Sequence, residues 1–540
     1  MIKNIRSYFQ DNLNVSLCLV LGVIIFFTGY AKARSIGLYG DDWGAATFLF
    51  EDNVRDAVKD WWHFGSGEIS NFRMLDSVLP ILWFYAFRLG GMLGVVLVSF
   101  FIYWGLAVLL FKILTKSLSV RTAFFGSLLF ALYPTNNAYL WHVTLSYSVA
   151  LLLVFWAVLL FKQSSYKKSL AVLLASILVN EGVFFIYFLA MLPNVGENVT
   201  RNSLWANLKK WLFIVFGILV VYVAARVGAE VTGITGGNRA VSVLGSFNLF
   251  AYIAQFIKSF AVVLVIGFAG IFWKIYNAFS SSHIWAGVLT SVLAFVSLRY
   301  LKVIELNNLN EKSDRRVALF AVLIGLMLIV AGRYYGFYYV PSINILNLDS
   351  RYYFAASVGG AVFFAGVFEH LQARYFMLHK LWLIIMCVTL GLCGLMRFEV
   401  QKDYADATIE AGSFWKSLHP VVLGAPENSF LYVQIPERVL GRPVGLFEAS
   451  GDLRNLLPKM YDSGVRGVTS AYVQKVVYEE DRVCLNSSPF YFNTCFQNKD
   501  FYSFEWKDGE LRQLRREKIN PVKTEFTHNI FKVFRLPLTN

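Results

Sequence analysis

The sequence predicts an α-helical polytopic membrane protein with about 11 to 13 transmembrane helices and a small C-terminal α+β domain outside the membrane. The first indication is composition: of 540 residues, 57% are apolar and 16% are charged, against roughly 25% charged in soluble proteins. The second is that the apolar residues form blocks of about 18 to 22 residues, enough to cross a hydrocarbon core. The third is that basic residues cluster between these blocks, as topology signals do, so the net charge of +14 does not indicate a nucleic-acid partner.

The first spanning helix is expected over residues 13–30, with the N-terminus in the cytoplasm. Lys3 and Arg6 precede this stretch, and no small-residue cleavage site follows it, so a cleaved signal peptide is not indicated. The later basic clusters mark cytoplasmic loops. They are Lys112/Lys116/Arg121, Lys162/Lys167/Lys168, Arg201/Lys209/Lys210, Arg299/Lys302/Lys312/Arg315/Arg316 and Arg374/Lys380.

The other connections are then expected on the outer side. They are residues 31–90, 133–145, 181–182, 229–248, 336–353 and everything after about residue 398. Residues 169–192 are predicted to form two short helices that meet at Asn180-Glu181. Residues 247–279 must cross the membrane an even number of times if the basic cluster at 299–316 is to stay in the cytoplasm. A hairpin, or an interfacial helix beside a misassigned neighbour, would satisfy this count. We therefore expect an odd total of about 11 or 13 crossings, with the C-terminus outside.

Two domains follow from this pattern: residues 1–397 in the membrane, with a long first outer loop at 31–90, and residues 398–540 as a soluble periplasmic α+β domain. The tail is polar, with turn signals at 441–443 and 450–452 and short alternating runs at 430–434 and 531–536. Cys484 and Cys495 flank a Ser-Ser-Pro turn, and a disulfide between them suits an oxidising compartment. Two unpaired thiols are the alternative.

The first outer loop carries the strongest chemical signal, the adjacent pair Asp41-Asp42 between Tyr39 and Trp43. Neighbouring carboxylates repel each other, which raises the pKa of one of them and keeps a base near working pH. The pair could accept a proton or hold a divalent cation; a solvated turn or a helix cap is the plainer interpretation. An amphipathic helix over residues 50–62 should follow in the membrane interface, with Arg73 beyond it at the mouth of the site.

Further polar residues are expected at the same outer rim. His142, next to Trp141, could donate to a phosphate or a sugar, although a histidine beside tryptophan is more often structural. Glu181 lies in an apolar context, where a carboxylate needs a partner or a proton. Arg351, followed by Tyr352, precedes an inward helix, and its guanidinium fork matches the oxygens of a lipid phosphate. A partner for Asp349 or a headgroup anchor is the alternative for Arg351.

Several classes of protein are excluded by missing motifs. The sequence has no Walker loop, no Cys/His spacing typical of a metal site, no Gly-x-Ser-x-Gly and no Gly-x-Gly-x-x-Gly in a strand–helix context. Nucleotide-driven chemistry is therefore unsupported, and an ATP-driven pump is excluded.

The order of these features resembles the C-type glycosyltransferase (GT-C) superfamily of integral-membrane enzymes, over about residues 1–400. The matching features are the acidic pair Asp41-Asp42, the segment Asn71-Phe72-Arg73, Pro134 with Trp141, Asn180-Glu181 and Arg351-Tyr352. Tyr133-Pro134 replaces the usual His-Pro or Asn-Pro, and Asn-Glu replaces the more common Lys-Glu. Within the superfamily the chain looks most similar to bacterial enzymes that modify surface polysaccharide, such as the O-antigen glucosyltransferases.

The resemblance implies a GT-C-like fold and the transfer of a monosaccharide from a polyprenyl-phosphate donor by an inverting displacement. Asp41 or Asp42 would accept the proton of the acceptor hydroxyl. The donor phosphate would be bound by Arg351, with help from Arg73 or His142. The residues expected to contact the substrates are Tyr39, Trp43, Trp141, Glu181 and Tyr352.

The expected setting is the bacterial inner membrane, with the site and the C-terminal domain facing the periplasm. The partners are the lipid-linked sugar donor, membrane lipids, and a glycan, lipid-linked glycan or protein acceptor, for example lipopolysaccharide. No cofactor should be required, although a divalent cation is possible. Two alternatives stay open: a polysaccharide polymerase or ligase that uses undecaprenyl-diphosphate chains, and a lipid-sugar flippase or transporter.

Overall fold

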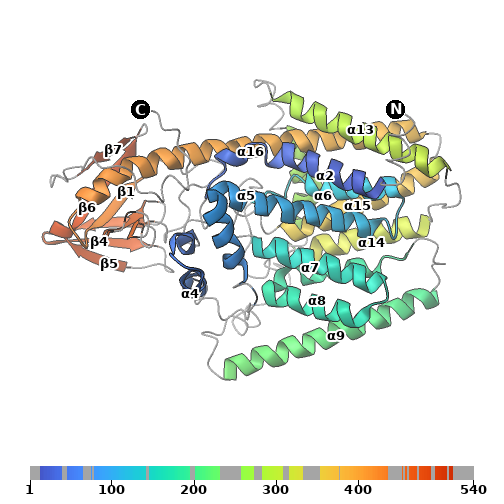
Figure 1. Cartoon of the computed structure of the whole chain (residues 1–540), viewed down its shortest axis with the longest axis horizontal. Helices are drawn as coiled ribbons and strands as arrows, with labels where there is room; N and C mark the ends of the chain where they lie inside the picture. Colours follow the sequence, from blue (N-terminus) through green and yellow to red (C-terminus); the bar gives the residue numbers. More distant parts are fainter. Residues whose placement is uncertain are drawn as a thin grey trace.

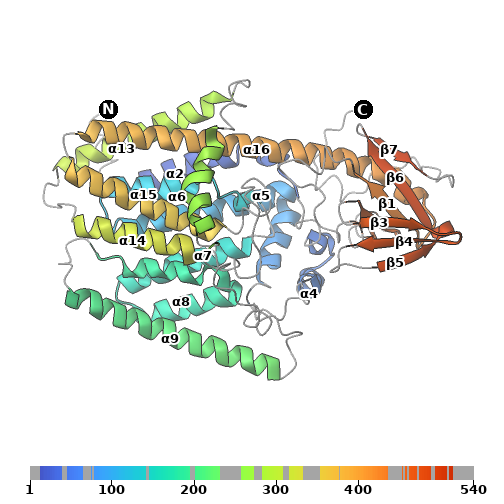
Figure 2. The same cartoon turned by 180° about the vertical axis from the view of Figure 1, so that it is seen from behind.

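The protein consists of a long helical bundle with a strand-containing region at one end (Figure 1). The structure is a computed structural model. It describes residues 13–38, 46–64, 75, 78–140, 145–194, 201–231, 254, 257–272, 283–307, 315–331, 353–375, 378–435, 453, 457–458, 461, 463–470, 473–487, 493–507 and 510–514. We call the two ends of the bundle the strand-side end and the far end. Figure 2 shows the same arrangement from behind.

Six helices are long and apolar enough to cross a membrane by length and composition. They belong to α5 (Val78–Leu114), α7 (Leu145–Lys162), α9 (Arg201–Val231), α13 (Ile284–Asn307), α15 (Phe354–Arg374) and α16 (His379–Gly424). Shorter segments lie among them: α2 (Leu13–Gly29), α6 (Val120–Ala131), α8 (Tyr166–Val179), the 3-10 helix η8 (Glu181–Met191) and α14 (Arg315–Ala331). The expectation of a mostly helical chain with long apolar helices is therefore confirmed for the described residues.

Small residues let neighbouring helices approach closely. At Gly366 in α15, an added Cβ would lie 2.8 Å from the backbone nitrogen of Val322 in α14. At Gly287 in α13, it would lie 3.0 Å from the carbonyl oxygen of Gly391 in α16. Close packing of this kind, with glycine at the contact, is typical of helices that associate in lipid.

Helix α5 bends at Gly91, where φ is 58° and ψ is −150°. L-residues rarely adopt this conformation, so the kink requires glycine. The bend separates an arm over residues 78–90 from the longer arm that runs through the bundle (Figure 1). The preceding helix α4 (Val54–Phe64) matches the amphipathic helix predicted over residues 50–62, and lies between the bundle and the strands in both views.

Helices α8 and η8 form the predicted hairpin, and they meet at Asn180. The Asn180 side chain accepts a hydrogen bond of 2.9 Å from the backbone N–H of Gly182 and so caps η8. At the other end of the hairpin, the Lys162 ammonium donates to the carbonyl oxygen of Leu192 over 2.6 Å. A side chain of the hairpin thus caps its turn, and the last residue of α7 holds its other end.

The segment predicted to cross an even number of times contains one described helical stretch, Ile257–Phe272. It includes a π-helical turn, Ala261–Ile266, and lies across the bundle in Figure 2 rather than along it. The Tyr133 hydroxyl, at the strand-side end of α6, donates to the carbonyl oxygen of Val263 over 2.9 Å. This stretch therefore packs beside one end of the bundle.

Helix α16 continues well past the predicted domain boundary at residues 397/398. Its 46 residues correspond to about 70 Å. The polarity of the chain rises after residue 397, yet buried residues keep a helical spacing of three and four through this part, at Tyr404, Ala407, Ala411, Phe414 and Leu418. The secondary structure therefore does not change at residue 397: the change in composition falls within a helix that keeps one buried stripe, and strands begin at Phe430.

The strands form two small sheets on the last part of α16. One has the order β2-β1-β6-β7, in which β1 is parallel to β2 and β6, and the other is the antiparallel meander β3-β4-β5. Their bounds are β1 Phe430–Gln434, β2 Arg466–Thr469, β3 Val473–Tyr478, β4 Arg482–Ser487, β5 Asn493–Gln497, β6 Phe501–Lys507 and β7 Glu510–Gln513. The strand predicted over residues 430–434 is confirmed. The turns predicted at 441–443 and 450–452 and the strand at 531–536 lie outside the described residues.

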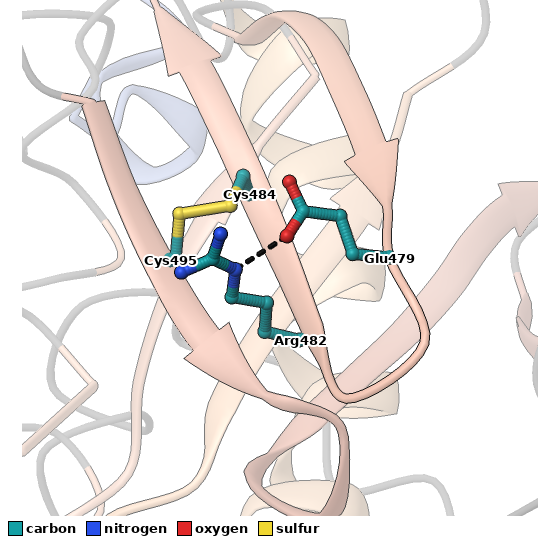
Figure 3. The surroundings of a disulfide bond; sticks show 4 residues. All are labelled: Glu479, Arg482, Cys484 and Cys495. Carbon is teal, nitrogen blue, oxygen red and sulfur yellow. Dashed lines mark hydrogen bonds and ion pairs between the residues drawn. A yellow bond between two sulfur atoms is a disulfide. The ribbon is translucent and has the colours of Figure 1, made fainter.

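A disulfide joins Cys484 in β4 to Cys495 in β5, the pairing suggested by the sequence (Figure 3). The two residues are direct partners across the antiparallel ladder. On the same hairpin, the Arg482 guanidinium donates to the Glu479 carboxylate, and this exposed ion pair raises the pKa of Arg482. The remaining cysteines, Cys18, Cys387 and Cys393, are free thiols in apolar helices.

Candidate functional site

Most of the residues predicted to form the site lie outside the described residues. They are Tyr39, Asp41, Asp42, Trp43, Arg73, Trp141, His142, Arg351 and Tyr352. Glu181 is described: it is partly exposed and begins η8 directly after the Asn180 cap. The described residues that precede or follow these positions show which end of the bundle these segments reach.

The described neighbours of several predicted residues meet at the strand-side end. Tyr30, which follows α2, packs against Tyr139, three positions before His142, with ring centroids 5.4 Å apart. The ring of Phe354, three positions after Arg351, has its centroid 6.2 Å from that of Phe130 near the end of α6. Three separate parts of the sequence thus reach one end of the bundle.

A buried arginine, Arg397 of α16, lies at the centre of this end. Its exposed fraction is 3%. The guanidinium carbon lies 3.4 Å from the ring centroid of Tyr139 and 4.7 Å from that of Tyr103. One terminal nitrogen, Nη1, donates to the carbonyl oxygen of Ala131, the last residue of α6, and to the Tyr103 hydroxyl over 3.3 Å. The positive charge is therefore held by rings and neutral oxygens.

The other guanidinium nitrogens, Nε and Nη2, have no hydrogen-bond partner in the described part of the chain. The hydroxyls of Tyr30 and Tyr139 beside them are also without one. At Gly29 an added Cβ would lie 2.9 Å from Nε, so a side chain at that position would crowd this edge of the guanidinium. Burying a charge without a counter-ion costs several kcal/mol, and the open N–H groups make this cluster a candidate anion site.

No carboxylate among the described residues forms an ion pair with Arg397. Glu399 is the nearest in sequence, and residues two apart on a helix do not face each other. Its carboxylate lies 2.9 Å from Nδ1 of His283, at the start of α13. On the other side, the Gln401 amide donates to the carbonyl oxygen of Thr28 over 3.1 Å and accepts from the backbone N–H of Lys32. These contacts fix α16 against α2 and α13. They do not provide a counter-ion for the guanidinium of Arg397.

The tyrosines near Arg397 do not neutralise it. Burial raises the pKa of Tyr139 to about 12, although the nearby Arg397 charge acts in the opposite direction. Tyr139 consequently remains protonated at neutral pH and offers a ring face and a hydroxyl rather than a counter-ion. The cluster of Tyr30, Tyr103, Tyr139 and Arg397, which we call the Arg397 cluster, carries one net positive charge.

Arg397 was not among the residues predicted for the site, because it marked only the end of the membrane part. A signal was available: Arg397 follows the apolar run 381–396, and ionisable residues at membrane depth are functional candidates by default. Among the described residues, no group of three or more His, Cys, Asp or Glu side chains could hold a metal ion. The acidic pair considered for a cation, Asp41-Asp42, is outside that part of the chain.

Comparison with known protein families and with curated proteins gave no match to this sequence. The function is therefore argued from the chemistry of the site. A buried guanidinium with two nitrogens that have no hydrogen-bond partner among the described residues is chemically suited to pair with an anion such as a phosphate, since the fork of arginine matches phosphate oxygens.

Proposed function

We propose that the protein is a membrane glycosyltransferase that moves a monosaccharide from a polyprenyl-phosphate donor to a cell-surface acceptor, such as O-antigen, on the periplasmic side. The observation that supports this most is the buried guanidinium of Arg397, which has no carboxylate partner and two nitrogens without a hydrogen bond among the described residues. It lies at the end of the bundle that the neighbours of the predicted donor-binding and catalytic residues also reach.

The membrane topology that we propose has an odd number of crossings. In the described residues, one pass each by α2, α5, α6, α7, α8, η8, α9, α13, α14, α15 and α16 makes eleven. The stretch Ile257–Phe272 adds none, which satisfies the parity required by the basic loops. This topology leaves the strands outside and the clusters around Lys112 and Lys162 in the cytoplasm, as the positive-inside rule requires.

The donor would be bound with its polyprenyl chain in the bilayer and its phosphate at the strand-side end. Arg397 would contact the phosphate through Nε and Nη2, the atoms without a partner. Arg351, Arg73 and His142 remain the further candidates for this role, and Trp43 and Trp141 those for stacking on sugar rings. Two or more cationic groups are reasonable here because the leaving phosphate gains charge in the transition state.

The transfer step would be a single displacement with inversion. Asp41 or Asp42 accepts the proton of the acceptor hydroxyl while the oxygen attacks the anomeric carbon. The bond between that carbon and the phosphate oxygen breaks, and its electron pair leaves with polyprenyl phosphate. General-base assistance contributes roughly 10²- to 10⁴-fold in rate. Loss of one charge-stabilising donor costs about 3–4 kcal/mol in the transition state.

The test is the composition of the surface glycan in cells that carry single variants. Asp41→Asn, Asp42→Asn and Arg397→Gln are compared with Asp52→Asn, an exposed carboxylate of the same loop to which no role is assigned. We expect mass spectrometry to show loss of one monosaccharide in the Arg397 variant and in at least one of the Asp41 and Asp42 variants, and none in the control. Unchanged glycans in both aspartate variants, with the proteins folded in membranes, would overturn the proposal.

The same cells separate transfer from transport. A flippase would leave the lipid-linked sugar on the cytoplasmic face when it is inactivated. A transferase that loses its base leaves an intact donor accessible from the periplasm. Accumulation of periplasmic donor in the Asp41→Asn or Asp42→Asn strain therefore supports transfer, and its absence together with trapped cytoplasmic donor supports transport.

A further inference from the structure

A pocket of about 450 Å³ opens at the far end of the bundle, opposite the Arg397 cluster. It lies between the ends of α5 and α7, with α2 on one side. Its lining residues are Cys18, Leu109, Phe111, Lys112, Thr115, Lys116, Trp156, Leu159 and Gln163. The proposed transfer reaction uses none of them.

The pocket changes polarity along its length. Leu109, Lys112 and Lys116 recur at spacings of three and four and so share one face of α5 and the turn after it. Trp156, Leu159 and Gln163 have the same spacing on α7 and the residue after it. In both stripes the residue deepest in the bundle is apolar and the residue at its end is polar. The distance from Leu109 to Lys116 along a helix is about 10 Å.

The charged end of the pocket is purely cationic. Lys112 and Lys116 are both exposed, and no acidic residue is among the lining residues. The nearby Lys162 differs, since its ammonium is held by the Ser117 hydroxyl at 3.0 Å and by a backbone carbonyl. Glu369, the buried carboxylate at this end, accepts a hydrogen bond of 2.6 Å from the Ser119 hydroxyl. No ion pair within the described chain engages Lys112 or Lys116.

The open side of the pocket faces where lipid would lie. Trp156 is half exposed, and on α2 the residues next to Cys18 include Leu19, of which 55% is exposed. Tryptophan is favoured at membrane interfaces because one edge is apolar and the other polar. An apolar wall that leads to two ammonium groups matches an amphiphile with an anionic head.

We infer that this pocket binds an anionic phospholipid, with its phosphate between Lys112 and Lys116 and an acyl chain along Leu109 and Trp156. Basic pockets between transmembrane helices on the cytoplasmic side are a known form of lipid headgroup site. The volume falls in the range of ordinary ligand sites, about 300–1,000 Å³. The inference needs the membrane-spanning arrangement and does not depend on glycosyl transfer.

The experiment is native mass spectrometry of the purified full-length chain in detergent, titrated with dioleoylphosphatidylglycerol or dioleoylphosphatidylcholine. The test variant is Lys112→Gln/Lys116→Gln. The matched control is Lys167→Gln/Lys168→Gln, which removes the same charge from two exposed lysines at the start of α8. A third variant, Lys112→Arg/Lys116→Arg, keeps the charge.

We expect the test variant to bind phosphatidylglycerol about 25-fold more weakly, which corresponds to about 1 kcal/mol for each lysine. The control and the arginine variant should bind as the native chain does, and phosphatidylcholine should bind weakly to all four. Glycerol phosphate, offered without acyl chains, should not compete. Equal loss in the control variant, equal binding of phosphatidylcholine, or displacement by glycerol phosphate would overturn the inference.

Discussion

Replacing Arg397 by methionine should remove transfer while leaving the fold stable. The guanidinium is buried, and part of it has no partner in the described chain, so its charge is expensive to keep. If the arginine serves the donor phosphate, the protein retains this cost for function. The variant therefore separates a ligand-binding role from a structural one, because a structural role predicts a large loss of stability and a ligand-binding role predicts little change.

The magnitude follows from the contacts. The change removes a charged donor to the Ala131 carbonyl, worth about 1.5–3 kcal/mol, although that oxygen keeps a hydrogen bond of 3.2 Å from the Tyr103 hydroxyl. It also removes cation–π contacts with the rings of Tyr103 and Tyr139, about 1–2 kcal/mol each when buried. Against this, the desolvation of the guanidinium, several kcal/mol, is relieved. The losses and the gain are of similar size, so the free energy of unfolding should change by no more than about 2 kcal/mol.

The assay is thermal unfolding of the detergent-solubilised chain, followed by tryptophan fluorescence, beside transfer measured on the surface glycan. We expect an unfolding midpoint within a few degrees of the native one, and transfer reduced at least 10²-fold. The Arg397→Lys variant should recover part of the transfer, since it keeps the charge but lacks the fork. Destabilisation above about 4 kcal/mol would mean that the arginine is structural, and full transfer in the methionine variant would refute its contact with the donor.

Three further outcomes are expected from the fold. Changing Cys484 and Cys495 to serine should lower the free energy of unfolding of the strand region by roughly 3 kcal/mol for a loop of this size. Circular dichroism melts measure this loss, and under reducing conditions the variant and the native chain should unfold alike. Gly91→Ala should cost about 1–3 kcal/mol in the same thermal assay because φ is positive there, whereas Gly90→Ala, whose Cβ meets nothing within 4 Å, should not. Tyr139→Phe should be neutral at pH 7, because the hydroxyl has no hydrogen-bond partner among the residues that the structure describes. Since the pKa of Tyr139 is raised from 10.0 to about 12, its contribution to stability is complete below pH 10 and is lost as the pH rises through 12, so the variant should flatten that part of the stability profile.

The features that could be predicted from the sequence are those encoded locally. The hairpin at Asn180 was predictable because one polar pair interrupts two short apolar runs, and its cap needs only the next two residues. The strand at Phe430 was predictable from alternation over five positions. The cysteine pair was predictable from its spacing across a turn.

Composition and secondary structure diverge at the predicted domain boundary, where α16 continues to Gly424. After residue 397 the chain becomes polar, which suggested a new domain, but the spacing of Tyr404, Ala407 and Ala411 already indicated a helix with one buried face. A test of periodicity across the change in composition would have extended the helix. The bend at Gly91 had a weaker signal, the adjacent pair Gly90-Gly91 within an apolar run, because glycine is frequent in transmembrane helices and a pair alone does not say which residue bends the chain.

Arg397 could not have been assigned to the site from its own neighbours in the sequence. Its hydrogen-bond partner Tyr103 is 294 positions away, and the rings around it come from three other parts of the chain. What distinguishes Arg397 from the interfacial arginines is the absence of a described carboxylate beside it, and a missing counter-ion is a property of the assembled fold. The missing carboxylate also points to a role for Arg397. A buried charge without a counter-ion from the described residues costs free energy in the ligand-free protein, so a ligand that supplies the opposite charge is the simplest reason for keeping it.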